Sequence, residues 1–169
     1  MERKDINELA ERAGKEAADK YQTGWTWPEA ILLSLRENRC LEVSDDVVKA
    51  STPLGAGLGF SKNMCGCLTS AALALGLKYG RTDLSASRKP SWSRAARLVE
   101  NFTKKYHTVC CGDITDKFND FSGTSRIHHC MEIIAFTTSQ VAGLLFDPND
   151  GFNDVEKERH LERREKYKA

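Results

Sequence analysis

The sequence has little proline, few aromatic residues and no excess of charge of either sign. Its 169 residues include 4 prolines, 8% aromatic residues, and 25 Lys and Arg against 24 Asp and Glu, which leaves a net charge of +1. Nucleic-acid binding usually needs a basic surface, and a net charge near zero does not indicate one. We therefore expect no nucleic-acid partner.

Long apolar segments are scarce as well. The N-terminal stretch MERKDINELAERAGKEAADKYQ is charged from its second residue and lacks the apolar core of a secretory signal. No window approaches the roughly 18 to 20 consecutive apolar residues that a membrane-spanning helix needs. We therefore expect a cytoplasmic protein without a membrane partner, in a compartment that keeps most thiols reduced.

What the chain does have is six cysteines. A chain of this length can bury an apolar core without disulfides, so the cysteines are not needed as staples. In a reducing compartment they indicate metal ligation, redox chemistry or burial as small apolar side chains.

Apolar residues recur at helical spacing along nearly the whole chain, and runs of alternating polarity are few. The pattern predicts an all-α fold, a single-domain antiparallel helical bundle with a glycine-rich loop, LGAGLGF, at residues 54–60. The expected organisation is an N-terminal helix at 1–21, a cysteine-containing helical domain at 22–146 and a charged tail at 147–169. The individual helices are expected at about 4–21, 26–38, 44–49, 65–79, 92–107 and 129–146.

In such a bundle, successive helix ends alternate between two poles. This alternation brings five cysteines to the pole of the glycine-rich loop and leaves Cys40 at the other as a core residue. The five are Cys65, Cys67, Cys110, Cys111 and Cys130. Amide groups at helix starts favour thiolates, and a cage of thiolates ringed by such donors is what an iron–sulfur cluster requires.

Burial as core residues is the alternative interpretation for each thiol taken singly, because cysteine is among the most buried residue types. Cys67 is ambiguous in this respect. Cys110 and Cys111 are adjacent and cannot both point the same way in regular structure, so at most one is a first-choice ligand. Structural zinc is less favoured, because paired CxxC units are absent.

The segment CGCLTSAALALGLKYGR at residues 65–81 resembles a known motif. It is similar to the CGAxxG segment of the small redox-active proteins named for their C-GCAxxG-C-C pattern, a domain also found in split-Soret cytochromes. The resemblance covers about residues 22–146. It implies that Cys65 is the motif cysteine, that Cys111 in CCGDITDKF is the third family cysteine, and that Cys130 in HHCMEII is the fourth.

The chain departs from the family pattern at three positions. Trp27 stands where the family has its first cysteine, the motif alanine is Cys67 and the motif glycine is Ser70. The resemblance therefore implies a rearranged four-thiolate site, with Cys110 in reserve, made of Cys65, Cys67, Cys111 and Cys130. No CxxCH haem-attachment motif occurs, so the cytochrome role does not carry over.

We therefore predict a protein that binds an iron–sulfur cluster through these cysteines and exchanges electrons with a protein partner. A homodimer is compatible with the resemblance, although the sequence does not show one. The second hypothesis is a metal-free thiol/disulfide oxidoreductase in which Cys65 is the reactive thiolate and Cys111 or Cys130 resolves it. The third is a non-catalytic helical interaction module, whose binding face would include Trp25, Trp27 and Trp92. Spacing alone defines no catalytic acid or base.

Overall fold

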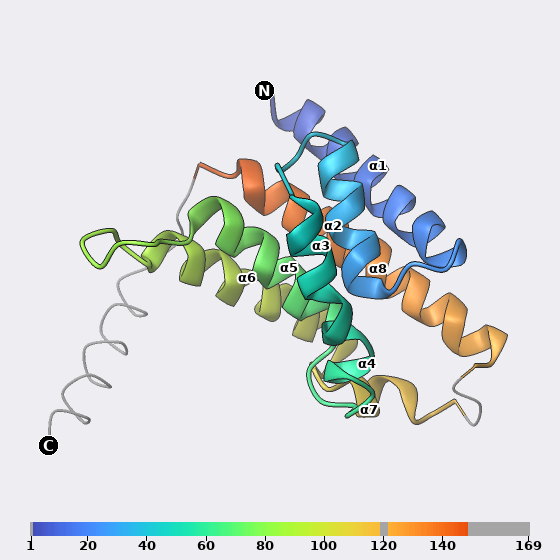
Figure 1. The fold of residues 1–169 in the computed structure, drawn as a ribbon. Helices are drawn as coiled ribbons and strands as arrows, with labels where there is room; N and C mark the ends of the chain where they lie inside the picture. Colours follow the sequence, from blue (N-terminus) through green and yellow to red (C-terminus); the bar gives the residue numbers. More distant parts are fainter. Residues whose placement is uncertain (1, 119–121, 149–169) are drawn as a thin grey trace, which may run out of the picture.

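The computed structural model describes residues 2–118 and 122–148, which form helices packed around a common apolar core (Figure 1). No strand occurs in this part of the chain, where the β structure is one isolated bridge between Met64 and Cys110. The predicted all-α fold is confirmed. The elements are α1 (Arg3–Gln22), α2 (Trp27–Glu37), α3 (Asp45–Ser51), a 3₁₀ turn (Thr52–Leu54), α4 (Gly55–Leu58), α5 (Gly66–Tyr79), α6 (Lys89–Tyr106), α7 (Cys111–Thr115) and α8 (Thr124–Phe146).

Helix α2 begins as its sequence predicts. Thr26 is its N-cap, Pro28 lies in the first turn, and Glu29 accepts a hydrogen bond from the Thr26 backbone N–H at 2.9 Å. Its apolar residues Ile31 and Leu35 are completely buried, so the helix is central to the core. Helix α2 packs against α1, α3, α5 and α8.

Helix α8 begins at Thr124, five residues before the expected start at 129. Cys130 therefore lies in the second turn of the helix and not at its start, which corrects the expectation. The first turn consists of the polar residues Thr124, Ser125 and Arg126. Because they are polar, the sequence shows no apolar periodicity there that would predict the start of the helix.

The same helix is long and apolar enough to cross a membrane when it is judged by length and composition alone, with a mean hydropathy of 1.2 over its best window. Half of that window is buried inside the protein. Because α8 packs against α1, α2, α5 and α6, and core helices pass the same test, this property is weak evidence for a membrane segment.

The start of α6 and the presence of α7 also differ from the expected helices. Helix α6 begins at Lys89 instead of 92, and Pro90 in its first turn suits that start. Helix α7 was not expected at all, because five residues are too few to show helical periodicity. Of the charged tail predicted at 147–169, residues 149–169 lie outside the described residues.

The glycine-rich segment folds as a left-handed turn. Backbone φ angles are positive at Ala56 (52°), Gly57 (72°), Leu58 (70°), Gly59 (60°) and Phe60 (64°). Backbone hydrogen bonds hold the turn, among them Lys62 N–H to Ala56 O at 3.2 Å and Asn63 N–H to Gly57 O at 3.1 Å. The glycine-rich loop that the sequence predicts is therefore a compact turn, which lies next to α7 at one end of the molecule (Figure 1).

Candidate functional site

Four cysteines from three helical segments line one small cavity. Cys65 and Cys67 lie at the start of α5, Cys111 begins α7, and Cys130 lies in α8. Their exposed fractions are between 1% and 8%. The cavity volume is about 20 Å³, and the remaining lining residues are Trp27, Ala56, Gly66, Ile114, Thr115, Arg126 and Ile133. A cavity of this size holds about one water molecule.

Backbone hydrogen bonds join the two cysteine-bearing loops. The Cys65 N–H donates to Val109 O at 2.8 Å, and the Cys111 N–H donates to Asn63 O at 2.6 Å. Nearby, Lys62 forms an ion pair with Asp116 at 2.7 Å. Because the left-handed turn positions residues 62 and 63, it also determines where Cys111 lies relative to Cys65.

Cys65 and Cys67 have opposite electrostatic environments. A hydrogen bond from the Cys67 thiol, followed by the backbone amides of Cys67 and Leu68, lowers the pKa of Cys65 despite its burial. The same hydrogen bond, together with burial, raises the pKa of Cys67 well above its ordinary value. Cys65 is the N-cap residue of α5, where unpaired amides favour a thiolate. Of the two cysteines, Cys65 therefore forms a thiolate more readily.

Burial is the largest influence on the pKa of the other two thiols of the cavity, Cys111 and Cys130. It raises the pKa of Cys111 to about 11, with the negative charges of neighbouring thiolates adding to the effect. It also raises the pKa of Cys130, although Arg126 opposes this rise. Without a cation between them, the cavity therefore keeps Cys111 and Cys130 as neutral thiols at neutral pH.

Trp27 and Arg126 complete the site beside Cys130. The Trp27 indole N–H donates a hydrogen bond to the Cys130 sulfur, and Arg126 Nη1 lies 3.7 Å from the same sulfur. Arg126 is not among the predicted site residues, because the expected start of the helix at 129 leaves residue 126 outside it. A signal was present: residues 126 and 130 are four apart and share one helix face once α8 begins at 124.

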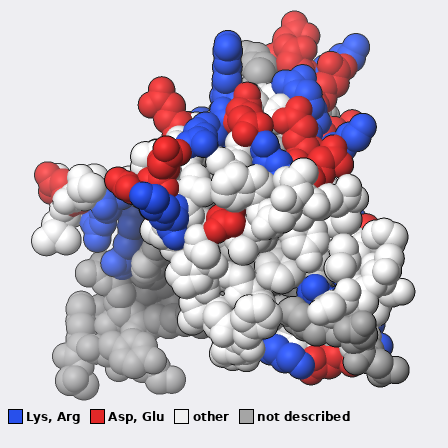
Figure 2. All heavy atoms as spheres, turned by 45° about the vertical axis from the view of Figure 1, so that its right-hand side comes forward, with Lys and Arg blue, Asp and Glu red and all other residues white. Residues whose placement is uncertain are grey.

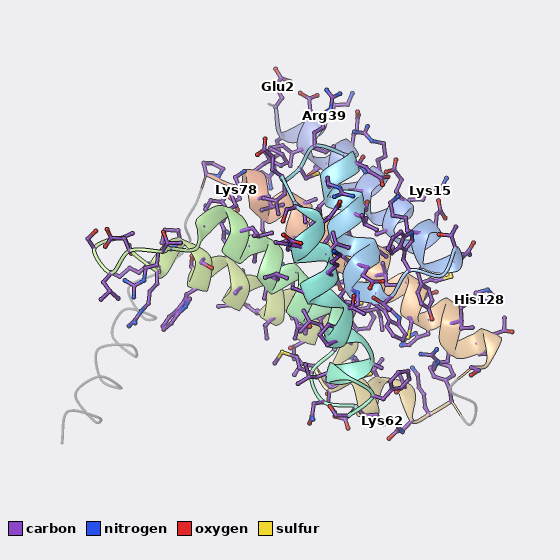
Figure 3. All side chains as sticks on the ribbon, viewed as in Figure 1. Glu2, Lys15, Arg39, Lys62, Lys78 and His128 are labelled. Atoms are coloured by element: carbon purple, nitrogen blue, oxygen red, sulfur yellow. The ribbon has the colours of Figure 1, made fainter. Side chains whose placement is uncertain are left out.

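Two cysteines lie outside the cavity lining. Cys110 is partly exposed, and its thiol donates to Lys62 O at 3.2 Å. Burial raises the pKa of Cys40 to about 11, and the nearby charge of Lys78 opposes this rise. Figure 3 shows Lys78 far from Lys62, which marks the end with the cysteine cavity. Cys40 therefore lies far from the site.

The cysteines fit an iron–sulfur cluster in donor type and in burial. Four buried thiols face a cavity that Trp27, Ile114 and Ile133 also line, so a cluster there is shielded from water. The fit in space is incomplete. Within residues 2–118 and 122–148, no group of three or more His, Cys, Asp or Glu side chains is arranged to hold a metal ion. The thiols would have to turn outward around a cluster larger than the cavity.

Comparison with protein families gives a match that agrees with this geometry. Residues 28–144 match the family described as "Putative redox-active protein (C_GCAxxG_C_C)". Because the match covers more than half of the 169 residues, the chain belongs to this family. The family supports a general redox role for the chain. Comparison with curated proteins and with solved structures gives no match.

Proposed function

We propose that this protein is an electron carrier whose Cys65, Cys67, Cys111 and Cys130 hold an iron–sulfur cluster. The observation that supports this proposal is the meeting of four buried thiols, from three separate segments, at one cavity. A thiol–disulfide mechanism uses two thiols, and its substrate must reach one of them. Four buried thiols exceed that need and match the four-cysteine ligand set of a cluster.

The bound cluster would supply reversible one-electron transfer. The protein's own residues would ligate and shield it. The backbone amides of Cys67 and Leu68 face the Cys65 sulfur and favour its anionic form. The apolar side chains of Ile114 and Ile133 help to exclude water from the cavity. Such a dry, donor-rich environment stabilises clustered negative charge and adjusts the reduction potential.

The surface beside the cavity suits a redox partner protein. Leu58, Phe60 and Met64, all close to Cys65 in the sequence, have exposed fractions of 58%, 72% and 46%. Figure 2 shows charged side chains gathered in the upper part of its view, with a largely uncharged area below them. Exposed apolar groups next to a redox centre allow close approach of a partner, so we propose that electrons are exchanged at this surface. We also propose that the protein acts in the cytoplasm.

A second candidate is a dithiol oxidoreductase, in which the contact between Cys65 and Cys67 favours Cys67 as the resolving thiol in place of Cys111 or Cys130. The Cys65 thiolate would attack a small disulfide and release one substrate thiolate. The Cys67 thiol, after losing its proton to that thiolate, would then displace the second. This sequence forms a Cys65–Cys67 disulfide and reduces the substrate by two electrons.

One anaerobic preparation separates the two candidates. We expect protein purified without oxygen to be coloured and to contain iron and acid-labile sulfide in equal amounts. Colourless, metal-free protein overturns the cluster. Mass mapping after oxidation then tests for the Cys65–Cys67 disulfide, whose absence overturns the dithiol candidate.

A further inference from the structure

Cys130 is the cavity thiol that receives hydrogen-bond donors from two other side chains. The Trp27 indole N–H and the Arg126 guanidinium both face its sulfur. An indole N–H can only donate, and a guanidinium has no acceptor, so both groups favour negative charge on sulfur. They come from α2 and α8, which are separated by about 90 residues of chain.

The geometry places a permanent charge inside the core. Arg126 is 4% exposed, and its guanidinium carbon lies 5.6 Å from the centre of the Trp27 ring. Tyr21 stacks on Trp27 at 5.2 Å and forms a hydrogen bond with Arg126. The aromatic rings thus hold the guanidinium next to Cys130. Because arginine stays charged at all relevant pH values, this charge is a fixed property of the cavity.

We infer that Trp27 and Arg126 are positioning residues that hold the Cys130 sulfur and raise the reduction potential of the thiol centre. Each electron added to a thiolate-bound cluster increases its negative charge, and a nearby cation in a medium of low dielectric stabilises the reduced form. Donors to a ligand sulfur act in the same direction. The effect on potential rests on the proposed function, whereas the positive field at Cys130 does not.

The first experiment measures the midpoint potential of the loaded protein in four forms. We expect Arg126→Met to lower the ratio of reduced to oxidised centre at a fixed applied potential by about tenfold, which is about 59 mV for one electron. Arg126→Lys keeps the charge and should retain most of the potential. Trp27→Phe keeps the ring without the donor and should give a smaller shift of the same sign. Equal potentials in wild type and Arg126→Met overturn the inference.

The second experiment uses the metal-free protein, so it does not depend on the cluster. At one pH, the rates of modification of Cys130 by anionic iodoacetate and by neutral iodoacetamide are compared. Both reagents attack the thiolate, so their rate ratio cancels the ionised fraction and reports the local field. Because Arg126 attracts the anion, we expect the ratio of the iodoacetate rate to the iodoacetamide rate to fall by about threefold or more in Arg126→Met. The ratio should stay close to the wild-type value in Arg126→Lys.

Cys40 is the internal control, because its nearby cations are Arg12 and Lys78 and not Arg126. Its ratio should not change in any variant. If Arg126→Met does not fold, Arg126→Gln replaces it, since glutamine keeps hydrogen-bond donors without the charge. An unchanged Cys130 ratio in the neutral variant overturns the inference. Iron-free wild-type protein overturns only the proposed cluster, and the reagent ratio then decides the inference.

Discussion

Replacing Gly57 by alanine should disrupt the turn that connects the two cysteine-bearing loops. Gly57 has a φ of +72°, and a Cβ at this position would lie 2.5 Å from the Asn63 amide nitrogen and 2.7 Å from the Lys62 carbonyl carbon. Both atoms belong to the backbone, so no side chain can turn aside. Gly59 is the matched control, because its φ is +60° and no atom lies within 4 Å of its Cβ position.

Both substitutions carry the cost of a left-handed alanine, and only Gly57→Ala also loses hydrogen bonds. A left-handed conformation costs an L-residue about 1–2 kcal/mol, and the reduced entropy of the unfolded chain offsets about 0.4–1 kcal/mol of this. We therefore expect Gly59→Ala to lower the free energy of unfolding by about 1 kcal/mol. Gly57→Ala also displaces residues 62 and 63, whose carbonyls accept from Gly112 and Cys111. Losing two or three such bonds, at about 1 kcal/mol each, brings its total to about 3–4 kcal/mol.

Urea unfolding of both metal-free variants, followed by far-ultraviolet circular dichroism, measures the difference in unfolding free energy. The rate at which Cys111 is alkylated in the native state is a second readout, since its N–H anchors it to Asn63 O. We expect faster alkylation in Gly57→Ala only. If Gly57→Ala is no more destabilised than Gly59→Ala, the reasoning about this turn is refuted.

Three further predictions concern the cysteines. Cys65→Ser should lose most of its iron, whereas Cys40→Ser should keep it, because Cys40 lies outside the cavity lining; equal iron contents in the two variants contradict the proposed ligand set. Cys67→Ser should also lose iron, and adding Trp27→Cys should restore it, since Trp27 lines the same cavity. If the double variant contains no more iron than Cys67→Ser, a cysteine at position 27 does not replace Cys67 as a ligand. Burial raises the pKa of Cys40 from 9.0 to about 11, so between these values the unfolded chain releases a proton that the folded chain keeps. Stability of the metal-free protein should therefore fall as pH rises from 9 to 11, and Cys40→Ala should make this fall shallower; an identical slope in urea titrations rejects the assignment.

Much of the fold could be predicted because it depends on local pattern. The start of α2 follows from Thr26, Pro28 and Glu29, and its core face follows from apolar spacing. The start of α8 could not be predicted in this way. Arg126 is polar but buried, in contact with Trp27 and Cys130, so polarity in the sequence does not show that the core begins there.

The sequence by itself determined the helical class, the family and the presence of cysteines at a helix start, because periodicity and short motifs are local properties. Only the tertiary structure decided that Trp27 lies beside Cys130, and that Cys111, which the resemblance favours over Cys110, lines the same cavity. The physical reason is that these contacts depend on the path of the chain. A left-handed turn at residues 56–60 and the packing of α2 against α8 bring together groups that no spacing in the sequence connects.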